Sequence, residues 1–191
     1  MNVNIPVASE TAKGIIEIAT AAEVAALTDA TRAVTPASLK SGALIDVTPT
    51  YINYTGGSIA STSTSFADLH ASAAFTGLAP GFYIGEFYIG YSAAATTTGA
   101  RFALNGTVTQ DYLSYLIGYS TQSGDRSSAQ THVFDGGAAA PSSLATTGNN
   151  AILQFSIHVT AAGDIAFRFA SEVGGSAITV TSLIGFIRRV S

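Results

Sequence analysis

Apolar side chains recur at every second position in several stretches of residues 49–191, and this period of two limits the fold more than any other feature. Residues 153–159 alternate Leu, Phe, Ile and Val with polar residues, and residues 165–169 repeat the alternation after the turn residues Gly163 and Asp164. Such a period is typical of a β-strand with one buried face. Because turn signals recur about every ten residues, we predict about eight to ten short strands in a mainly-β fold, an antiparallel jelly-roll β-sandwich.

Three further segments carry specific strand signals. Residues 82–91 are rich in aromatic and β-branched side chains, as strands are. Residues 101–104 and 107–110 flank Asn105-Gly106, a pair that favours a two-residue turn, so we predict a β-hairpin there. Residues 178–190 form the predicted final strand.

The strands at residues 82–91 and 178–190 are apolar on both faces. In the first strand, one face is expected to hold Phe82, Ile84 and Tyr88, and the other Tyr83, Phe87 and Ile89. In the last strand, simple alternation predicts one face with Ile178, Val180, Ile184 and Phe186, and the other with Leu183 and Ile187. An antiparallel sheet in a monomer normally keeps one face in water. We therefore predict an obligate oligomer, in which identical chains cover the second face.

The N-terminal residues carry helix signals instead. Thr20 and Glu23 have the spacing of a capping box, in which each side chain bonds the backbone amide of the other residue. Residues 22–27 that follow suit a helix of one or two turns. Helices this short are unstable in isolation, so they must pack on something. The alternative is a flexible tail with accidental capping residues.

A second helix start lies at Thr35 and Pro36, with Thr at the N-cap and Pro at the first helical position. Gly42 fits the end of that helix. The strand pattern begins only after these residues. We therefore divide the chain into an N-terminal connector or attachment segment, residues 1–48, and a jelly-roll head domain, residues 49–191.

The composition argues against several classes of function. Only 10% of residues are charged and the net charge is −4, whereas 47% are apolar, so part of the surface is expected to be buried against other copies. Without a basic excess, nucleic acid is not an expected partner. The chain has no cysteine for disulfides or thiolate metal sites. Neither a secretory signal nor a run of about 18 apolar residues occurs, so no membrane insertion is expected.

No arrangement of side chains in the sequence predicts an enzyme. Three histidines lack metal-ligand spacing, although a threefold axis would gather three copies of any one of them: His70, His132 and His158. The sequence contains no G-x-S-x-G nucleophile motif. Two acidic pairs have arbitrary spacing for glycoside hydrolysis: Glu86 with Asp111, and Asp125 with Asp135. We predict no catalytic residue, no metal site and no cofactor.

Residues 111–150 form the longest segment without a regular pattern, and we predict an irregular loop region there. Aromatic rings beside polar groups suit shallow recognition of a sugar or a protein. The candidate receptor-binding residues are Tyr112, Tyr115, Tyr119, Asp125, Arg126, His132 and Asp135. The alternative is an ordinary jelly-roll loop without a ligand.

Residues 10–39 carry the pattern ETxxGIxEIATxAEVxxxTDxxRAVTPxxL, which resembles the connector segment of bacteriophage tail-fibre and related virion-fibre proteins. One departure is Leu27, where the family usually has Gly before Thr-Asp. The resemblance implies that this segment attaches the chain to other virion proteins. The candidate connector residues are Ile15, Ile16, Ile18, Glu23, Thr35 and Pro36.

The C-terminal region resembles, more loosely, the trimeric jelly-roll heads of tumour necrosis factor and complement C1q. The resemblance rests on residues 66–69, 77–83, 102–104, 162–163 and 187–190. It implies a homotrimer with aromatic and aliphatic side chains stacked about the threefold axis. The candidate interface residues are Phe82, Phe87, Tyr88, Phe186 and Ile187.

Together these patterns predict a non-enzymatic structural protein of a phage virion. It would be a homotrimeric fibre or spike on the tail or capsid surface, and it would contribute to binding a glycan or protein receptor on the host surface. Two alternatives stay open. One is a capsid or tail decoration protein without a receptor role, and the other is a carbohydrate-binding, lectin-like module.

Overall fold

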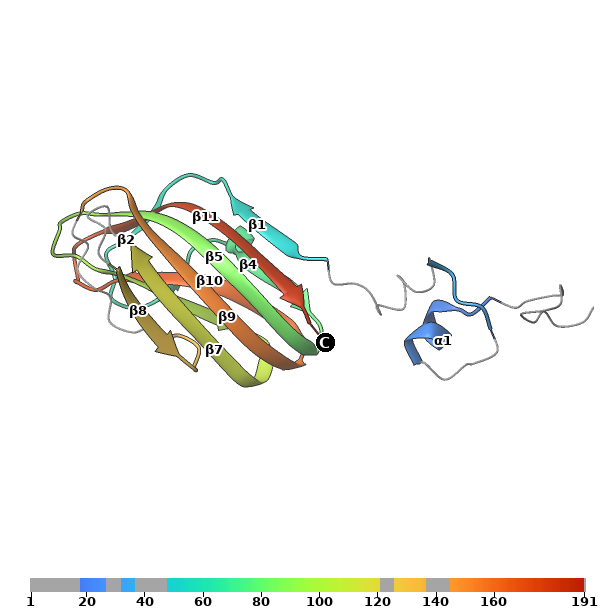
Figure 1. The fold of residues 1–191 in the computed structure, drawn as a ribbon. Coiled ribbons are helices and arrows are strands. Elements are labelled where there is room, and N and C mark those ends of the chain that lie inside the picture. The colour runs from blue at the N-terminus through green and yellow to red at the C-terminus, as the bar shows by residue number, and fades with distance from the viewer. Residues whose placement is uncertain (1–17, 27–31, 37–47, 121–125, 137–144, 191) are drawn as a thin grey trace, which may run out of the picture. The chain divides into compact units, whose positions relative to one another are not determined.

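The computed structural model describes residues 18–26, 32–36, 48–120, 126–136 and 145–190, with backbone only at 126–129. The chain divides into two compact units, Met1–Val47 and Thr48–Ser191 (Figure 1). No helix in the described ranges has the length and apolarity needed to cross a bilayer.

In the described part of the N-terminal unit, residues Ala21–Ala26 form a short helix, α1, which begins at the predicted capping box. The Thr20 amide donates to Glu23 Oε2 at 2.9 Å, and the Glu23 amide donates to Thr20 Oγ1 at 3.4 Å. Val24 is the buried residue of the helix, and Ile18 pairs with Ala33 in a parallel bridge. The predicted capping box and helix are confirmed. At the second predicted start Pro36 is helical, and Gly42 lies outside the described residues.

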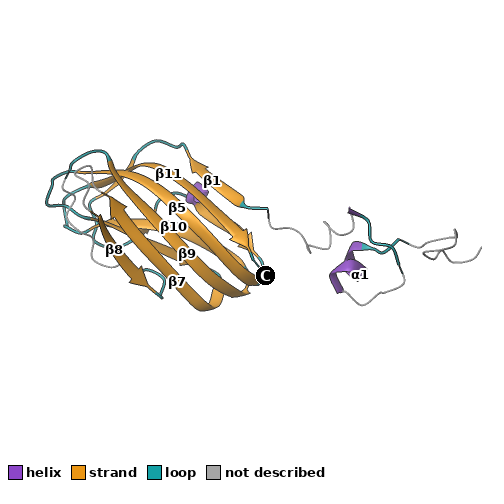
Figure 2. Ribbon diagram, in the orientation of Figure 1, coloured by secondary structure: helices purple, strands orange, loops and turns teal. Residues whose placement is uncertain are grey.

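The larger sheet of the second unit has seven strands and is antiparallel throughout. Its order is β1 (Thr50–Tyr54), β11 (Ile178–Arg189), β5 (Gly81–Ala93), β9 (Asn149–Ala161), β7 (Thr109–Ser120) and β8 (Arg126–Thr131). A short strand, β2 (Ile59–Ser61), also pairs with β11. The longest strands, β5 and β9, lie side by side at the centre of the sheet, and β11 lies on the other side of β5 (Figure 2).

The smaller sheet has four antiparallel strands. Its order is β3 (Ala67–Asp68), β10 (Gly163–Ser171) and β4 (Ala74–Leu78), with β6 (Ala100–Gly106) also paired to β10. A single 3₁₀ turn, Ala71–Ala73, precedes β4. The chain passes between the two sheets at β2–β3, β4–β5, β5–β6, β6–β7, β9–β10 and β10–β11. Repeated crossing of this kind is typical of a jelly roll, so the predicted mainly-β sandwich with a short N-terminal helix is confirmed.

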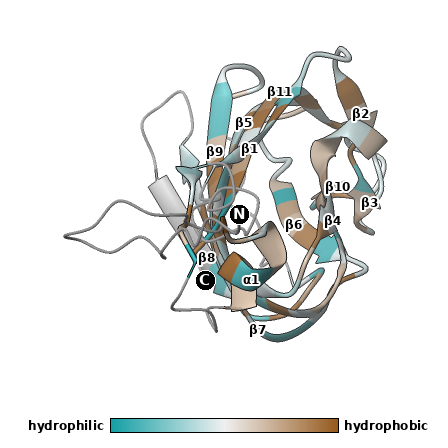
Figure 3. Ribbon diagram, turned by 90° about the vertical axis from the view of Figure 1, so that its right-hand side faces the viewer, coloured by the Kyte–Doolittle hydropathy of each residue, from teal (hydrophilic) through white to brown (hydrophobic). Residues whose placement is uncertain are grey.

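The hydrophobic core fills the space between the two sheets, which Figure 3 shows as facing layers. Phe87 on β5 lies at its centre, fully buried, with ring centroids 5.4 Å from Phe75 on β4 and 5.2 Å from Phe167 on β10. The predicted alternation at residues 153–159 and 165–169 is confirmed, because the large apolar residues there all point into this core. Aromatic pairs at these separations add to the stabilisation that burial alone provides.

The predicted hairpin at Asn105-Gly106 is wrong. Strand β6 pairs with β10 in the smaller sheet, whereas β7 pairs with β8 and β9 in the larger one. The Thr107 amide donates to the carbonyl of Asp164 at 3.0 Å, and Val108 is buried. These long-range contacts carry the chain across the sandwich where the local sequence alone favoured a tight turn.

The predicted faces of the last strand are also wrong, because β11 contains a β-bulge. Its pairing with β5 shifts between Val180 and Ser182, and the extra residue moves the alternation by one position. Ile178 and Val180 therefore share the buried face with Leu183. Ile184 and Phe186, which were predicted on the same face as Ile178 and Val180, point outward.

Candidate functional site

The outward-pointing side of the seven-stranded sheet is unusually apolar, and we call it the outer sheet face. Its exposed large apolar residues range from Leu116, 40% exposed, to Tyr51, 70% exposed. The others on this face are Phe82, Tyr88, Tyr112, Ile152 and Ile184, with Ile84 and Phe186 partly exposed. A solvent-facing sheet surface normally carries polar residues. A contiguous apolar patch instead marks an interaction surface.

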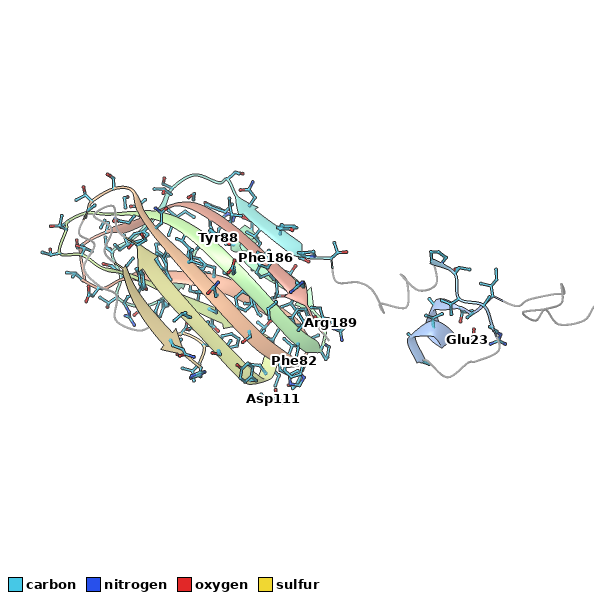
Figure 4. The ribbon with its side chains drawn as sticks, in the orientation of Figure 1. Glu23, Phe82, Tyr88, Asp111, Phe186 and Arg189 are labelled. Carbon is cyan, nitrogen blue, oxygen red and sulfur yellow. The ribbon has the colours of Figure 1, made fainter. Side chains whose placement is uncertain are left out.

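Strand register places these side chains side by side. Ile184 on β11 pairs with Tyr88 on β5, and Tyr88 pairs with Ile152 on β9, so the three form a row across the sheet. At the edge, Tyr51 on β1 pairs with Phe186 on β11, with ring centroids 6.4 Å apart. Figure 4 shows Tyr88 and Phe186 on neighbouring strands of this sheet. Directly paired side chains on one face form the contacts that stabilise a sheet surface.

A polar group lies within this apolar surface, centred on Glu86. The Tyr88 hydroxyl donates to Glu86 Oε2 at 2.6 Å, and Gln154 donates from Nε2 to Glu86 Oε1. The hydrogen bond to the carboxylate, and then its negative charge, raise the pKa of the Tyr88 hydroxyl above its usual value. Both carboxylate oxygens of Glu86 therefore already accept hydrogen bonds within the subunit, from two neutral donors that bring no countercharge.

One end of the face, where Figure 4 shows Phe82 and Asp111 near Arg189 at the end of β11, contains His158. The Phe82 ring stacks on the His158 imidazole, and His158 Nδ1 lies 2.6 Å from Asp111 Oδ1. Phe82, His158 and Tyr112 occupy one register row across β5, β9 and β7. Among the described residues, no group of three His, Cys, Asp or Glu side chains is placed to hold a metal ion.

The structure divides the predicted interface residues into two groups. Phe82, Tyr88 and Phe186 lie on the outer sheet face. Phe87 and Ile187 are 0% and 2% exposed in the single subunit, so their prediction as interface residues is wrong. The smaller sheet already covers the inner side of the strands that carry them. Sequence reasoning missed Ile152 and Leu116, whose only signal is an apolar residue at a position that alternation assigns to water.

The predicted irregular region at residues 111–150 is wrong as well, since β7 and β8 occupy much of it. Tyr115 and Tyr119 are 1% and 2% exposed on β7 and belong to the core, so neither can contact a receptor. Burial raises the pKa of Tyr115 to about 12 and raises that of Tyr119 as well. Tyr112 lies on the outer sheet face. Asp125 and the Arg126 side chain lie outside the described residues.

His132 and Asp135 follow β8 but serve different contacts. His132 Nδ1 lies 3.3 Å from the carbonyl of Leu113. Asp135 turns toward the smaller sheet, where its Oδ2 accepts from Asn105 Nδ2 at 2.6 Å and from Arg168. The structure therefore does not gather the predicted receptor-binding residues into one site.

The predicted connector residues lie in the N-terminal unit. Ile18 is 59% exposed, while Ile15 and Ile16 lie outside the described residues. Glu23 caps α1 and forms an ion pair with Arg32. The remaining two, Thr35 and Pro36, are half-buried and exposed, respectively. Glu23 therefore has a structural role in this unit, and Ile18 exposes an apolar side chain.

No family model and no curated protein sequence matches this chain. Solved structures that it resembles include the Eiger TNF of S. frugiperda, at 12% identity and a TM-score of 0.36, covering 74% of this chain and 90% of that one. TmCBM61 in complex with β-1,4-galactotriose is 9% identical, with a TM-score of 0.22 and coverage of 64% and 86%. The VP2 subviral particle of infectious bursal disease virus is 10% identical, with a TM-score of 0.21 and coverage of 75% and 42%.

Proposed function

We propose that this chain is a non-enzymatic structural protein of a phage virion, a homotrimeric fibre or spike on the tail or the capsid. Residues 49–191 are its head and residues 1–48 attach it to other virion proteins. The head contributes to binding of the host surface. The observation that carries the proposal is the apolar outer sheet face, which a single subunit leaves exposed to water.

Energetic reasoning supports assembly through this face. Obligate interfaces bury about 2,000–5,000 Å². At about 25 cal/mol per Å² of apolar surface, the gross gain is tens of kcal/mol, before the costs of association are subtracted. With only 10% charged residues, this chain has little electrostatic repulsion to oppose it. Tyr88, Ile184 and Ile152 lie in the middle of the face, where a neighbouring subunit would exclude water most completely.

The N-terminal unit supports the attachment role. Its helix α1 has six residues, well below the length that is stable alone in water. Ile18 and Val34 are 59% and 53% exposed, so the unit offers apolar contacts to a partner. The connector-like sequence pattern of residues 10–39 points to virion proteins as that partner. Three linked heads would then turn weak single contacts with the host into useful avidity.

The test is sedimentation of the full chain and two matched variants. Ile184→Asp places a charge in the middle of the outer sheet face, and Val173→Asp places one on an exposed valine in the β10–β11 turn. We expect trimers for the wild type and Val173→Asp, and folded monomers for Ile184→Asp. A wild type that is a folded monomer at micromolar concentration would contradict the trimer.

A second measurement tests the host-binding part. Excess purified trimer should compete with phage for adsorption to host cells, and the Ile184→Asp monomer should compete far less at equal subunit concentration. If the trimer forms and fails to compete, a decoration protein without a receptor role is the better description.

A further inference from the structure

A second surface feature lies on the opposite side of the sandwich. On β10, Ile165 and Phe167 point into the core, so Ala166 and Arg168 between them point away from it. Here the outer side of the four-stranded sheet has an open hollow of about 730 Å³, which we call the small-sheet groove. Ligand sites commonly fall within about 300–1,000 Å³. Because the groove is on the sheet opposite the outer sheet face, assembly through that face leaves it open.

We propose that the small-sheet groove binds a neutral, polyhydroxylated ligand, a saccharide of the host surface. This inference rests on the proposed function and names the chemical class of its receptor. The groove residues that carry the argument are Asp68, His70, Asn105, Asp164, Ala166 and Arg168. They come from β3, β6 and β10 and from the segments that follow or join these strands.

The chemistry of the lining favours hydroxyl groups. Carboxylate acceptors, an amide and an imidazole surround a floor that includes the small side chain of Ala166. A sugar hydroxyl both donates and accepts hydrogen bonds, so it needs both kinds of partner within reach. Within the described residues, Asp164 Oδ2 and His70 Nε2 have no hydrogen-bond partner, which leaves an acceptor and a ring nitrogen for a ligand.

The charges of the groove disfavour an anionic ligand. Arg168 is its cation, and Arg168 already pairs with Asp68, at 2.9 Å, and with Asp135. Asp68 and Asp164 therefore leave the lining with no surplus positive charge. The lining also contains no Phe, Tyr or Trp side chain, so an apolar ligand would find little surface to cover. A neutral ligand rich in hydroxyls meets both conditions.

The polar side chains of the groove are held in place before any ligand arrives. Asp135 binds both Arg168 and Asn105, and it does so with a φ of 53°, a conformation that non-glycine residues rarely adopt. Arg168 also donates to the carbonyl of Phe66 at 2.9 Å, and Asp164 Oδ1 accepts from the Gly77 amide at 2.8 Å. Fixed side chains lose little entropy on binding, which favours affinity.

The experiment is a glycan array probed with the full chain, followed by titration of the best neutral oligosaccharide. Ala166→Leu fills the floor of the groove, and Ala60→Leu makes the same change at an exposed position on β2. We expect Ala166→Leu to weaken binding by about tenfold or more, and Ala60→Leu to bind like the wild type. Asp164→Asn keeps the side-chain shape and should weaken binding severalfold. Thermal melting of each variant verifies that it is folded.

The outcomes separate this inference from the proposed function. A trimer that binds no neutral glycan, that binds only anionic glycans, or that binds equally well as Ala166→Leu overturns the saccharide site and leaves the assembly standing. A monomeric wild type that binds a neutral glycan and loses it on Ala166→Leu supports the groove and contradicts the trimer.

Discussion

The ring of Phe82 lies parallel to the imidazole of His158, with centroids 4.0 Å apart and planes inclined by 11°. Phe82 lies near the start of β5, and the Nδ1 atom of the stacked His158 ring lies 2.6 Å from Asp111 Oδ1. The stack therefore joins the apolar part of the outer sheet face to its polar rim. It also fixes the orientation of an aromatic ring that a neighbouring subunit would contact.

Replacing His158 with alanine tests this stack. We expect His158→Ala to lower the free energy of unfolding by about 0.5–1.5 kcal/mol, because the Phe82 ring loses its partner. Urea unfolding at constant protein concentration measures the change. Asp111→Asn is the matched control, since it removes the charge and leaves the two stacked rings in place. If both variants lose the same stability, the contact with Asp111 and not the stack holds this corner.

Replacement by alanine should change stability in opposite directions at two glycines of the seven-stranded sheet, Gly85 on β5 and Gly118 on β7. A Cβ added at Gly85 would lie 2.5 Å from the carbonyl oxygen of Phe186 and would also clash with the ring of Phe155. A Cβ at Gly118 would meet no atom within 4 Å. We expect Gly85→Ala to destabilise the domain by about 1–3 kcal/mol. Gly118→Ala should be neutral or stabilising by about 0.4–1 kcal/mol.

Urea midpoints of the two glycine variants, compared with the wild type, measure this difference. Equal stability of the two would mean that the backbone at β5 and β11 moves apart easily. The close approach of Gly85 to Phe186 would then not limit the packing of these central strands.

The fold class could be predicted from the sequence because it depends on local patterns. Alternation at residues 153–159 reports which side of β9 is buried, whatever strand lies beside it. The spacing of Thr20 and Glu23 likewise specifies a capping box within four residues. Neither pattern depends on residues elsewhere in the chain.

The errors arise where distant residues decide the local structure. The bulge after Val180 is defined by pairing with β5, about 90 residues earlier, so simple alternation assigned the wrong faces in β11. The side chain of Asn105 binds Asp135, and β6 pairs with β10, so the Asn-Gly pair does not close a hairpin. Phe87 was assigned to an interface because the sequence does not reveal that a second sheet covers its side.

The small-sheet groove could not be predicted from sequence for the same reason. Asp68, Asn105 and Arg168 are far apart along the chain, and no sequence pattern links the three of them. Only the pairing of β3 and β6 with opposite edges of β10 brings them to one surface.

The capping box of α1 predicts a measurable effect in the N-terminal unit. Thr20→Ala removes the hydroxyl that accepts from the Glu23 amide, and we expect a loss of about 0.5–2 kcal/mol of helix stability. Amide hydrogen exchange at Val24, whose amide donates to the Thr20 carbonyl at 3.0 Å, reports the loss as reduced protection. Thr20→Ser keeps a hydroxyl and should retain most of the protection. Unchanged exchange in Thr20→Ala would show that tertiary contacts, and not the cap, hold the helix.

The buried tyrosine Tyr115 predicts how stability responds to alkali. Its pKa is about 12 in the folded domain and near 10 in the unfolded chain, because burial disfavours the phenolate. The unfolded state therefore releases this proton first as the pH rises. The stabilisation is complete below about pH 10 and is lost between about pH 10 and 12.

Tyr115→Phe removes the ionisable hydroxyl, so this residue no longer contributes to the pH dependence of stability. The hydroxyl donates to the carbonyl of Val133 at 3.2 Å, so we expect the variant to lose about 1 kcal/mol at neutral pH. Between about pH 10 and 12, its free energy of unfolding should fall less steeply than that of the wild type, by up to about 1.4 kcal/mol per pH unit. Urea unfolding at a series of pH values measures both slopes. Parallel slopes above pH 10 would mean that Tyr115 ionises as readily in the folded domain as in the unfolded chain, which its position in the core forbids.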